Sequence, residues 1–160
     1  MDLLGQSDRS AMVVTHELEV MRDETSSYFE LGDADLERRY GPDKWSVRFV
    51  LHHLADVEAV ELERIHRTLS EPRPNLPTID ADAWAKGLGY EHRSIEVSRA
   101  LFEAARNSVL QYAHLFYEAK GDLTYVHSEY GPLSLREEFE KIARHNAKHL
   151  GHIRTALSNT

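Results

Sequence analysis

Apolar residues recur every three or four positions in four long stretches of the chain, as they do on one face of an α-helix. These stripes predict helices over residues 10–31, 45–69, 91–119 and 134–157. No stretch of useful length alternates apolar and polar residues as a half-buried strand would. The pattern therefore predicts an all-α protein, in which four long helices pack into a four-helix bundle.

Local signals mark where the predicted helices begin and end. Gly32 ends the first helix, and the prolines within residues 71–74 end the second. Ser134 and Glu137 have the spacing of a capping box, which predicts that the fourth helix starts there. Residues 71–89 contain three of the five prolines and two of the eight glycines. We expect this long connection to pack on the bundle, to cover a site and to permit a non-sequential order of helices.

Composition narrows the possible chemistry. The 160 residues suit a single domain over residues 1–160, and they include ten histidines but no cysteine. The lack of cysteine excludes a disulfide scaffold, thiolate zinc sites, iron–sulfur clusters and a cysteine nucleophile. Imidazole is then the commonest of several remaining options for a metal ligand.

Charge and hydropathy bear on partners and location. The chain has 27 acidic and 19 basic residues, a net charge of −8, which disfavours a nucleic-acid partner because phosphate binding needs clustered Lys and Arg. No apolar run approaches the roughly 18 residues of a membrane span, so no membrane partner is expected. The first ten residues lack the basic region and apolar core of a secretory signal. We therefore expect a cytoplasmic protein.

Helical phase predicts which histidines face the inside of the bundle and which face solvent. On the fourth predicted helix, His149 lies within the apolar stripe, His145 lies on its shoulder one turn earlier, and His152 lies further out. On the second helix, His53 flanks the interior, whereas the adjacent His52 points mostly to solvent. The phase therefore selects three histidines that face the inside of the bundle.

An H-x-x-x-H pair on one helix and one histidine from a neighbouring helix form a natural three-nitrogen metal site. The i,i+4 spacing lets His145 and His149 converge on one ion, and His53 would supply the third ligand. Three protein ligands leave at least one position for water or substrate. Spacing alone leaves a second interpretation open, because amphipathic helices often carry histidine at their edges.

Three segments together resemble the DinB-like superfamily, which includes proteins of the YfiT type. Residues 44–58, KWSVRFVLHHLADVE, carry a tryptophan followed eight residues later by a His-Leu-Ala-Asp element. Residues 69–84 resemble the acidic, proline-containing connection that leads to Asp-x-x-x-Trp, and residues 127–153 resemble the closing loop and H-x-x-x-H helix. The family's proline after the loop histidine is absent after His127. The first helix fits by length and periodicity only.

The resemblance implies a DinB-type bundle that holds a divalent metal on His53, His145 and His149. Three imidazoles suit zinc, nickel, copper or iron, and availability often decides which metal is bound; we expect zinc or nickel. The resemblance also implies a thiol-dependent S-transferase of the bacillithiol or mycothiol kind, acting on a small electrophilic substrate. Because the chain has no cysteine, the sulfur would come from a low-molecular-weight thiol as cosubstrate.

Two alternatives remain beside the transferase. The same site would serve metal-dependent hydrolysis, in which the metal lowers the pKa of a bound water. Alternatively, the bundle is not an enzyme and binds a small molecule or a partner helix, with a structural metal or none. The architecture also permits a homodimer.

Two acidic residues of the second helix are candidates for proton transfer. Asp56 lies one turn after His53 and either orients a histidine or is exposed to solvent. Glu61 projects near the middle of the apolar stripe, so it either lines an interior cavity or extends from the edge. A carboxylate inside the bundle would have to be paired or lie near a metal.

Four further side chains are candidates for lining a pocket, and each also has an ordinary structural interpretation. His152 could face a pocket or be a polar residue at the helix edge. Trp45 could face a pocket or pack between helices. Trp84 and Tyr125 could line a pocket mouth or anchor loops to the core.

Overall fold

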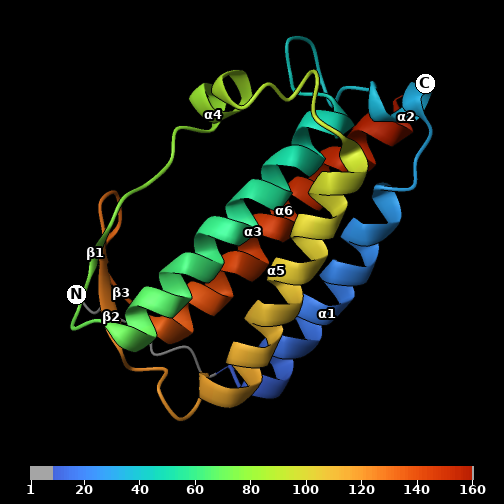
Figure 1. Ribbon diagram of the computed structural model, residues 1–160. Coiled ribbons are helices and arrows are strands. Elements are labelled where there is room, and N and C mark those ends of the chain that lie inside the picture. The colour runs from blue at the N-terminus through green and yellow to red at the C-terminus, as the bar shows by residue number, and fades with distance from the viewer. Residues whose placement is uncertain (1–8, 160) are drawn as a thin grey trace, which may run out of the picture.

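The computed structural model describes residues 9–159. Four long helices lie side by side (Figure 1), which confirms the predicted all-α bundle. They are α1 (Ala11–Tyr28), α3 (Val47–Ser70), α5 (Ile95–Phe116) and α6 (Leu135–Ser158). The order of packing is not sequential, because α1 and α3 each contact both α5 and α6. The consecutive helices α1 and α3 therefore lie diagonally across the bundle, as the long connection permitted.

Serine caps the N-terminus of every long helix. The side chains of Ser10, Ser46, Ser94 and Ser134 each accept a hydrogen bond from the backbone N–H three residues later. Such caps satisfy N–H groups that have no partner within the helix. The predicted capping box is present at Ser134, where the Glu137 side chain also accepts from the Ser134 backbone N–H. The start of α6, and with it the phase of its histidines, is thus locally determined.

A small three-stranded sheet lies at one end of the bundle, where no strands were predicted. Its strands are β1 (Asn75–Leu76), β2 (Thr124–His127) and β3 (Gly131–Ser134). β1 pairs with β2 in parallel, and β2 pairs with β3 antiparallel. Strands of two to four residues are too short for an alternating pattern to show in the sequence. The sheet fastens the connection between α3 and α5 to the segment before α6.

Part of the connection between α3 and α5 is helical. After β1 it forms α4 (Ala81–Gly87), which stands off the bundle in Figure 1. A further short helix, α2 (Asp33–Leu36), lies between α1 and α3. The connection returns to the bundle at Tyr90, a fully buried residue whose hydroxyl donates to Asp56 on α3 over 2.7 Å. The expected loop that packs on the bundle is thus a strand, a helix and a buried aromatic anchor.

The N-terminal half of α3 has no solvent-facing side, so the prediction that His52 points to solvent is wrong. All eight side chains of residues 50–57 are buried. His52 is 0% exposed, and its Nδ1 lies 2.7 Å from Ser98 Oγ on α5. The ring of Tyr90 lies 5.4 Å from the His52 ring. A helical wheel drawn from one apolar stripe misses this burial, because the covering residues come from a distant segment.

A buried ion pair sets how the four long helices meet. The guanidinium of Arg106 on α5 is 0% exposed and donates to both oxygens of Glu58 on α3, over 2.5 and 2.8 Å. It also donates to the backbone oxygen of Leu18 on α1 and to Asn146 Oδ1 on α6. Since a buried charge must be paired and hydrogen-bonded, these contacts fix the register of the helices. Asn146 lies between two candidate ligands, so the network also holds the site.

Within residues 9–159, no helix is both long and apolar enough to cross a bilayer. The expectation of no secretory signal concerns residues 1–10, and the first eight of these lie outside the described residues.

Candidate metal centre

Three histidines from two helices converge as predicted from helical phase. His53 projects from α3, and His145 and His149 project from adjacent turns of α6. One nitrogen from each lies within 4.8 Å of the others. The Nε2 atoms of His53 and His145 are 3.2 Å apart. Two nitrogens that each lie about 2.0–2.1 Å from a tetrahedral zinc ion would be roughly 3.4 Å apart, so this separation fits a shared ion.

The protonation state of the three imidazoles also fits a metal. Burial, with smaller contributions from neighbouring positive charges, lowers the pKa of His53 to about 4, of His145 to about 3 and of His149 to about 2. At His53 the charge of Asp56 opposes this lowering of the pKa. The neutral rings can therefore offer a nitrogen lone pair at neutral pH, as metal ligation requires. Among the described residues, the buried Nδ1 atoms of His53 and His149 have no hydrogen-bond partner. With Nδ1 carrying the proton, Nε2 is left free to ligate.

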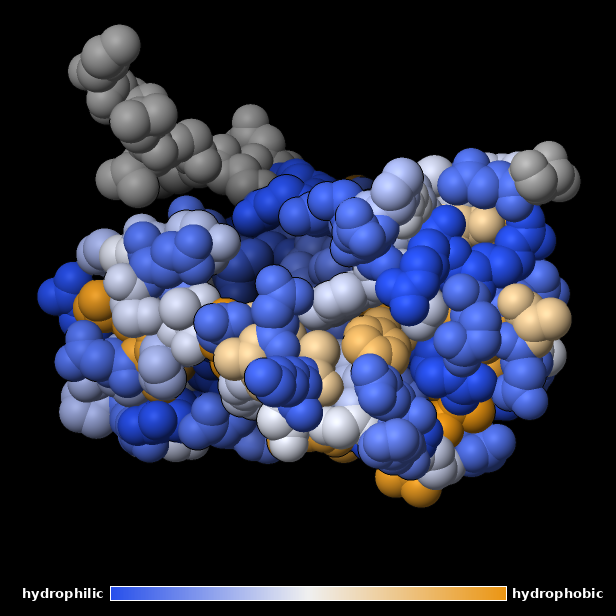
Figure 2. Space-filling view, turned by 90° about the horizontal axis from the view of Figure 1, so that it is seen from above, coloured by the Kyte–Doolittle hydropathy of each residue, from blue (hydrophilic) through white to orange (hydrophobic). Residues whose placement is uncertain are grey.

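The three histidines open onto a cavity of about 690 Å³. Its walls come from α3, α6, residues 40–45, the start of α4 and the turn between β2 and β3. This volume lies within the range of small-molecule sites, roughly 300–1,000 Å³. Seen from the end of the bundle that carries α2 and α4, the surface is largely hydrophilic and hollowed (Figure 2). A polar reactant can thus approach the histidines from one side.

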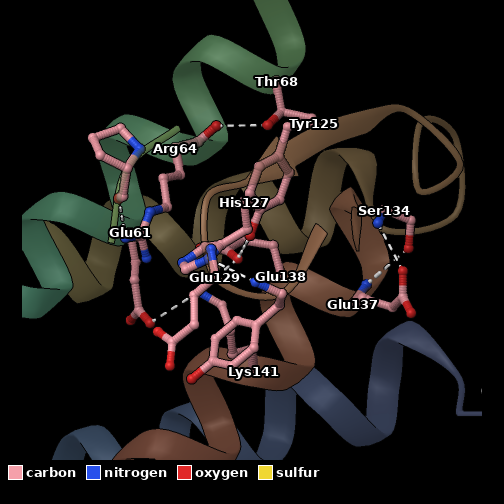
Figure 3. A network of polar contacts seen from close by, with 12 residues as sticks. Glu61, Arg64, Thr68, Tyr125, His127, Glu129, Ser134, Glu137, Glu138 and Lys141 are labelled. Atoms are coloured by element: carbon pink, nitrogen blue, oxygen red, sulfur yellow. Dashed lines mark hydrogen bonds and ion pairs between the residues drawn. The ribbon is translucent and has the colours of Figure 1, made fainter. Parts of the chain in front are cut away.

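Glu61 lies inside the molecule and lines this cavity, as one of its two interpretations predicted. Its side chain is 3% exposed, and Lys141 Nζ lies 3.6 Å from Glu61 Oε1. The same ammonium lies 2.8 Å from Glu138 Oε2 (Figure 3). Burial raises the pKa of the Glu61 carboxyl above its ordinary value, although Lys141 opposes that rise. A carboxyl of this kind can exchange a proton near neutral pH.

Asp56 does not orient a histidine and is not exposed to solvent. It is 8% exposed and accepts hydrogen bonds from the Tyr90 hydroxyl, over 2.7 Å, and from Arg93, over 2.6 Å. It is also not among the residues that line the cavity. The segment between α4 and α5 covers this face of α3, so Asp56 anchors that segment. The prediction of a role in proton transfer is therefore not supported by its position.

Two of the four predicted pocket residues line the cavity. Trp45 packs edge-on against the His53 ring, with centroids 5.2 Å apart. His152 stacks on Tyr40, with centroids 4.2 Å apart.

Tyr125 and Trp84 are not among the lining residues. Tyr125 is fully buried, and its hydroxyl donates to Glu138 behind the cavity wall. Trp84 is half-buried on α4. Tyr125 belongs to β2 and Trp84 to α4. Neither element was predicted from the sequence, so the positions of these two side chains could not be predicted either.

Several residues that line the cavity were not predicted from the sequence. Lys141 lies four residues before His145, so extending the i,i+4 series of α6 by one turn would have found it. Lys148 lies between the two histidines in the chain and lines the same wall. Tyr40 gave no signal, because its stacking on His152 joins residues that are far apart in the sequence.

Comparisons with known proteins agree with this geometry. The family model of the DinB superfamily matches residues 17–153. A protein of Oceanobacillus iheyensis is 29% identical over 129 residues, which cover 81% of this chain and 74% of that protein. A protein of Halalkalibacterium halodurans is 27% identical over 130 residues, which cover 81% and 75%. Both relatives carry the name "putative metal-dependent hydrolase".

A solved structure has the same fold. YfiT from Bacillus subtilis, described as a probable metal-dependent hydrolase with an unusual four-helix bundle topology, superposes with a TM-score of 0.84. The match covers 96% of this chain and 89% of YfiT at 20% sequence identity. With the diagonal arrangement of α1 and α3 and the histidine cluster between α3 and α6, these matches lead to one conclusion. The chain belongs to the DinB superfamily.

Proposed function

We propose that this protein is a metal-dependent hydrolase that acts on a small molecule. The observation that carries the proposal is the convergence of three neutral imidazoles, from His53, His145 and His149, at the wall of a polar cavity. The names of the relatives support the same class of reaction. Three protein ligands leave at least one position open toward the cavity, which is typical of a catalytic metal and not of a structural one.

A divalent metal, which we expect to be zinc or nickel, supplies Lewis-acid chemistry when bound, because it lowers the pKa of an oxygen or sulfur ligand and polarises a carbonyl. Glu61 lies two turns beyond His53 on α3 and lines the same cavity. Its raised pKa suits a group that takes a proton from the attacking molecule and returns it to the leaving group. Lys141, whose Nζ lies 3.6 Å from Glu61 Oε1, favours the charged form of Glu61 and so opposes part of the rise in its pKa.

Metal analysis of protein purified without a histidine tag tests the proposal first. We expect about one equivalent of a divalent metal, and uptake to that level when metal-free protein is titrated. Less than about a tenth of an equivalent of zinc, nickel, cobalt, manganese or iron, with no uptake on titration, would contradict it. That result would favour a non-enzymatic bundle that binds a small molecule.

Thiol-dependent transfer is the second candidate for the same site. A cavity of about 690 Å³ has room for two small reactants, which a transferase needs and a hydrolase does not. The absence of cysteine means that any sulfur nucleophile must be a cosubstrate. Metal-loaded protein incubated with a low-molecular-weight thiol and a haloarene separates the two reactions. A thioether conjugate indicates transfer, and a hydroxylated product formed without thiol indicates hydrolysis.

A further inference from the structure

We propose that the cavity holds an anionic group of its reactant, a carboxylate or phosphate, between the ammonium groups of Lys44 and Lys148. This inference rests on the proposed function in that it names the substrate class of the same site. Both lysines are exposed residues of the cavity wall, and they reach it from two different segments. Together they would orient the reactant relative to the three histidines.

Lys148 is close to the three candidate ligands, and Lys44 is close to His152, whose ring centroid lies 5.2 Å from that of His149. Lys148 stands on α6 one residue before His149, and its charge acts on the rings of His53, His145 and His149. Lys44 and Lys148 both act on the ring of His152. An anion held between these ammonium groups would therefore lie beside the candidate metal centre.

Neither lysine has a protein partner among residues 9–159. Other cations of the cavity wall do: Lys141 pairs with Glu61 and Glu138, and Arg64 donates to a backbone oxygen over 2.8 Å. No described carboxylate lies within ion-pair distance of Lys44 or Lys148, and their side chains make no hydrogen bond with a described residue. Two unpaired cations on one cavity wall are available for an anionic ligand.

The backbone holds Lys44 in place before any ligand arrives. Residues 41–44 form a turn in which the Lys44 N–H donates to Gly41 O over 3.2 Å, and Asp43 adopts a left-handed conformation with φ of 56°. Asp is one of the few residues besides Gly that enters this region readily. Arg39 donates to the Lys44 backbone oxygen over 2.6 Å. Only the side chain of Lys44 therefore has to be ordered by a bound anion.

Charge at the candidate metal centre favours an anionic ligand as well. Three neutral imidazoles leave the double positive charge of a bound metal uncompensated, and the cluster of ligand atoms within 4.8 Å contains no carboxylate among the described residues. Four acidic residues also line the cavity. Asp82 and Glu129 come from α4 and from the β2–β3 turn, Glu129 accepts from Thr78, and Glu61 pairs with Lys141. Asp43 precedes Lys44 in the chain but forms no ion pair with either lysine. The wall formed by α6 and residues 40–45 thus provides the place for the anion.

Aromatic rings beside the lysines indicate the rest of the reactant. Tyr40 and His152 are stacked at the wall that carries Lys148, and Trp45 follows Lys44 directly. Flat side chains of this kind pack against a planar apolar body. Benzoate is therefore a suitable probe of the proposed site, and benzamide is its neutral counterpart of nearly the same shape.

The test compares binding of benzoate and benzamide to metal-free protein at low salt, followed by the amide chemical shifts of residues around the cavity. We expect benzoate to bind about fivefold more tightly or better, and the preference to shrink at high salt because the charges are screened. The double variant Lys44→Gln, Lys148→Gln should bind both probes equally. Lys120→Gln, which removes an exposed lysine that contacts Phe116 outside the cavity, should keep the preference.

Equal binding of the two probes to the wild-type protein would overturn the inference. A benzoate preference that survives in the double variant, or the absence of any saturable shift at millimolar benzoate, would also overturn it. Metal uptake is measured on the same samples, so the two proposals fail separately. Preference for benzoate without uptake keeps the inference and contradicts the proposed function, whereas uptake without preference does the reverse.

Discussion

His52 and His53 are neighbours in the chain but serve different parts of the molecule. The His53 ring faces His145 and His149 across the gap between α3 and α6. His52 points toward α5, where its Nδ1 contacts Ser98. Since successive residues on a helix differ in direction by about 100°, both can be buried only where the helix is covered on several sides.

Replacing each of these histidines should separate metal binding from stability. We expect His53→Ala to abolish metal uptake, because it removes one of three ligands. His52→Ala should leave uptake nearly intact but lower the free energy of unfolding by about 1–3 kcal/mol, because it removes one of the two hydrogen-bond partners of Ser98 and creates a cavity. Titration calorimetry with zinc and urea unfolding measure the two effects. Equal loss of uptake in both variants would contradict the assignment of the ligands.

The buried histidines should make the metal-free protein sensitive to acid. Burial, with a smaller contribution from the Arg93 and Arg48 charges, lowers the pKa of His52 to about 4 from its ordinary 6.5. Between these values the unfolded chain binds a proton that the folded protein does not. The contribution of the neutral His52 ring to the free energy of unfolding is therefore fully present above about pH 6.5, and it is lost as the pH falls toward 4.

Urea unfolding between pH 7.5 and pH 5 measures this loss of stability. The free energy of unfolding should fall less in His52→Gln than in the wild-type protein, because one buried site of proton uptake is gone. His16→Gln, which alters an exposed residue of α1, is the matched control and should follow the wild type. If His52→Gln and the wild type lose stability in parallel, the buried imidazole is not a source of acid sensitivity.

At the scale of elements, the site depends on the register between α3 and α6. Arg106 links Glu58 of α3 with Asn146 of α6, and Asn146 lies between two of the candidate ligands in the chain. Asn146 also donates to Thr25 on α1. A network this deep inside the bundle aligns the two helices that carry the histidines.

Breaking this network should damage both the fold and the site. We expect Glu58→Gln to cost about 3–5 kcal/mol of unfolding free energy, because it leaves the buried Arg106 charge without its counter-charge. Zinc affinity should fall as well, since α6 is no longer held in register. Arg154→Gln removes an ion pair with Glu24 whose arginine is 57% exposed, and it should change stability by less than about 1 kcal/mol. Comparable losses in the two variants would contradict this account.

At the scale of the whole molecule, the two helices that bear the ligands are far apart in the sequence, since α3 lies in the first half of the chain and α6 near its end. They are held together by packing and by polar contacts such as the ion pair between Lys141 and Glu61. A metal bound to His53 and to His145 and His149 would therefore tie α3 to α6 directly. The connection that carries β1 and α4 closes the other side of the cavity. Binding of a metal should thus stabilise the entire bundle.

Thermal unfolding with and without metal checks this stabilisation. Zinc at a hundred times its dissociation constant should add about 2.7 kcal/mol to the free energy of unfolding, and a chelator should remove it. His149→Ala should show no such shift while remaining folded, because a single buried ring is replaced at the edge of the cavity. A rise in the melting temperature of His149→Ala equal to that of the wild type would place the metal elsewhere.

Helical phase and capping were readable in the sequence because both depend on residues within a few positions of one another. The phase of α6 follows from its capping box at Ser134 and its apolar stripe, so His145 and His149 could be selected without a structure. The same reasoning placed His53 toward the interior, and the resemblance to the DinB-like superfamily joined it to this pair. The lack of cysteine, likewise, excludes thiolate ligands from this chain whatever its fold.

Only the tertiary structure decided which side chains are covered by distant segments. Asp56 and His52 are buried because the segment around Tyr90 returns across α3, and no local pattern encodes that return. The strand β1 pairs with residues some 50 positions away, as Asn75 does with Val126. The cavity and its unpaired lysines arise from the same long-range contacts. Local sequence therefore determined which histidines could meet, and packing determined what surrounds them.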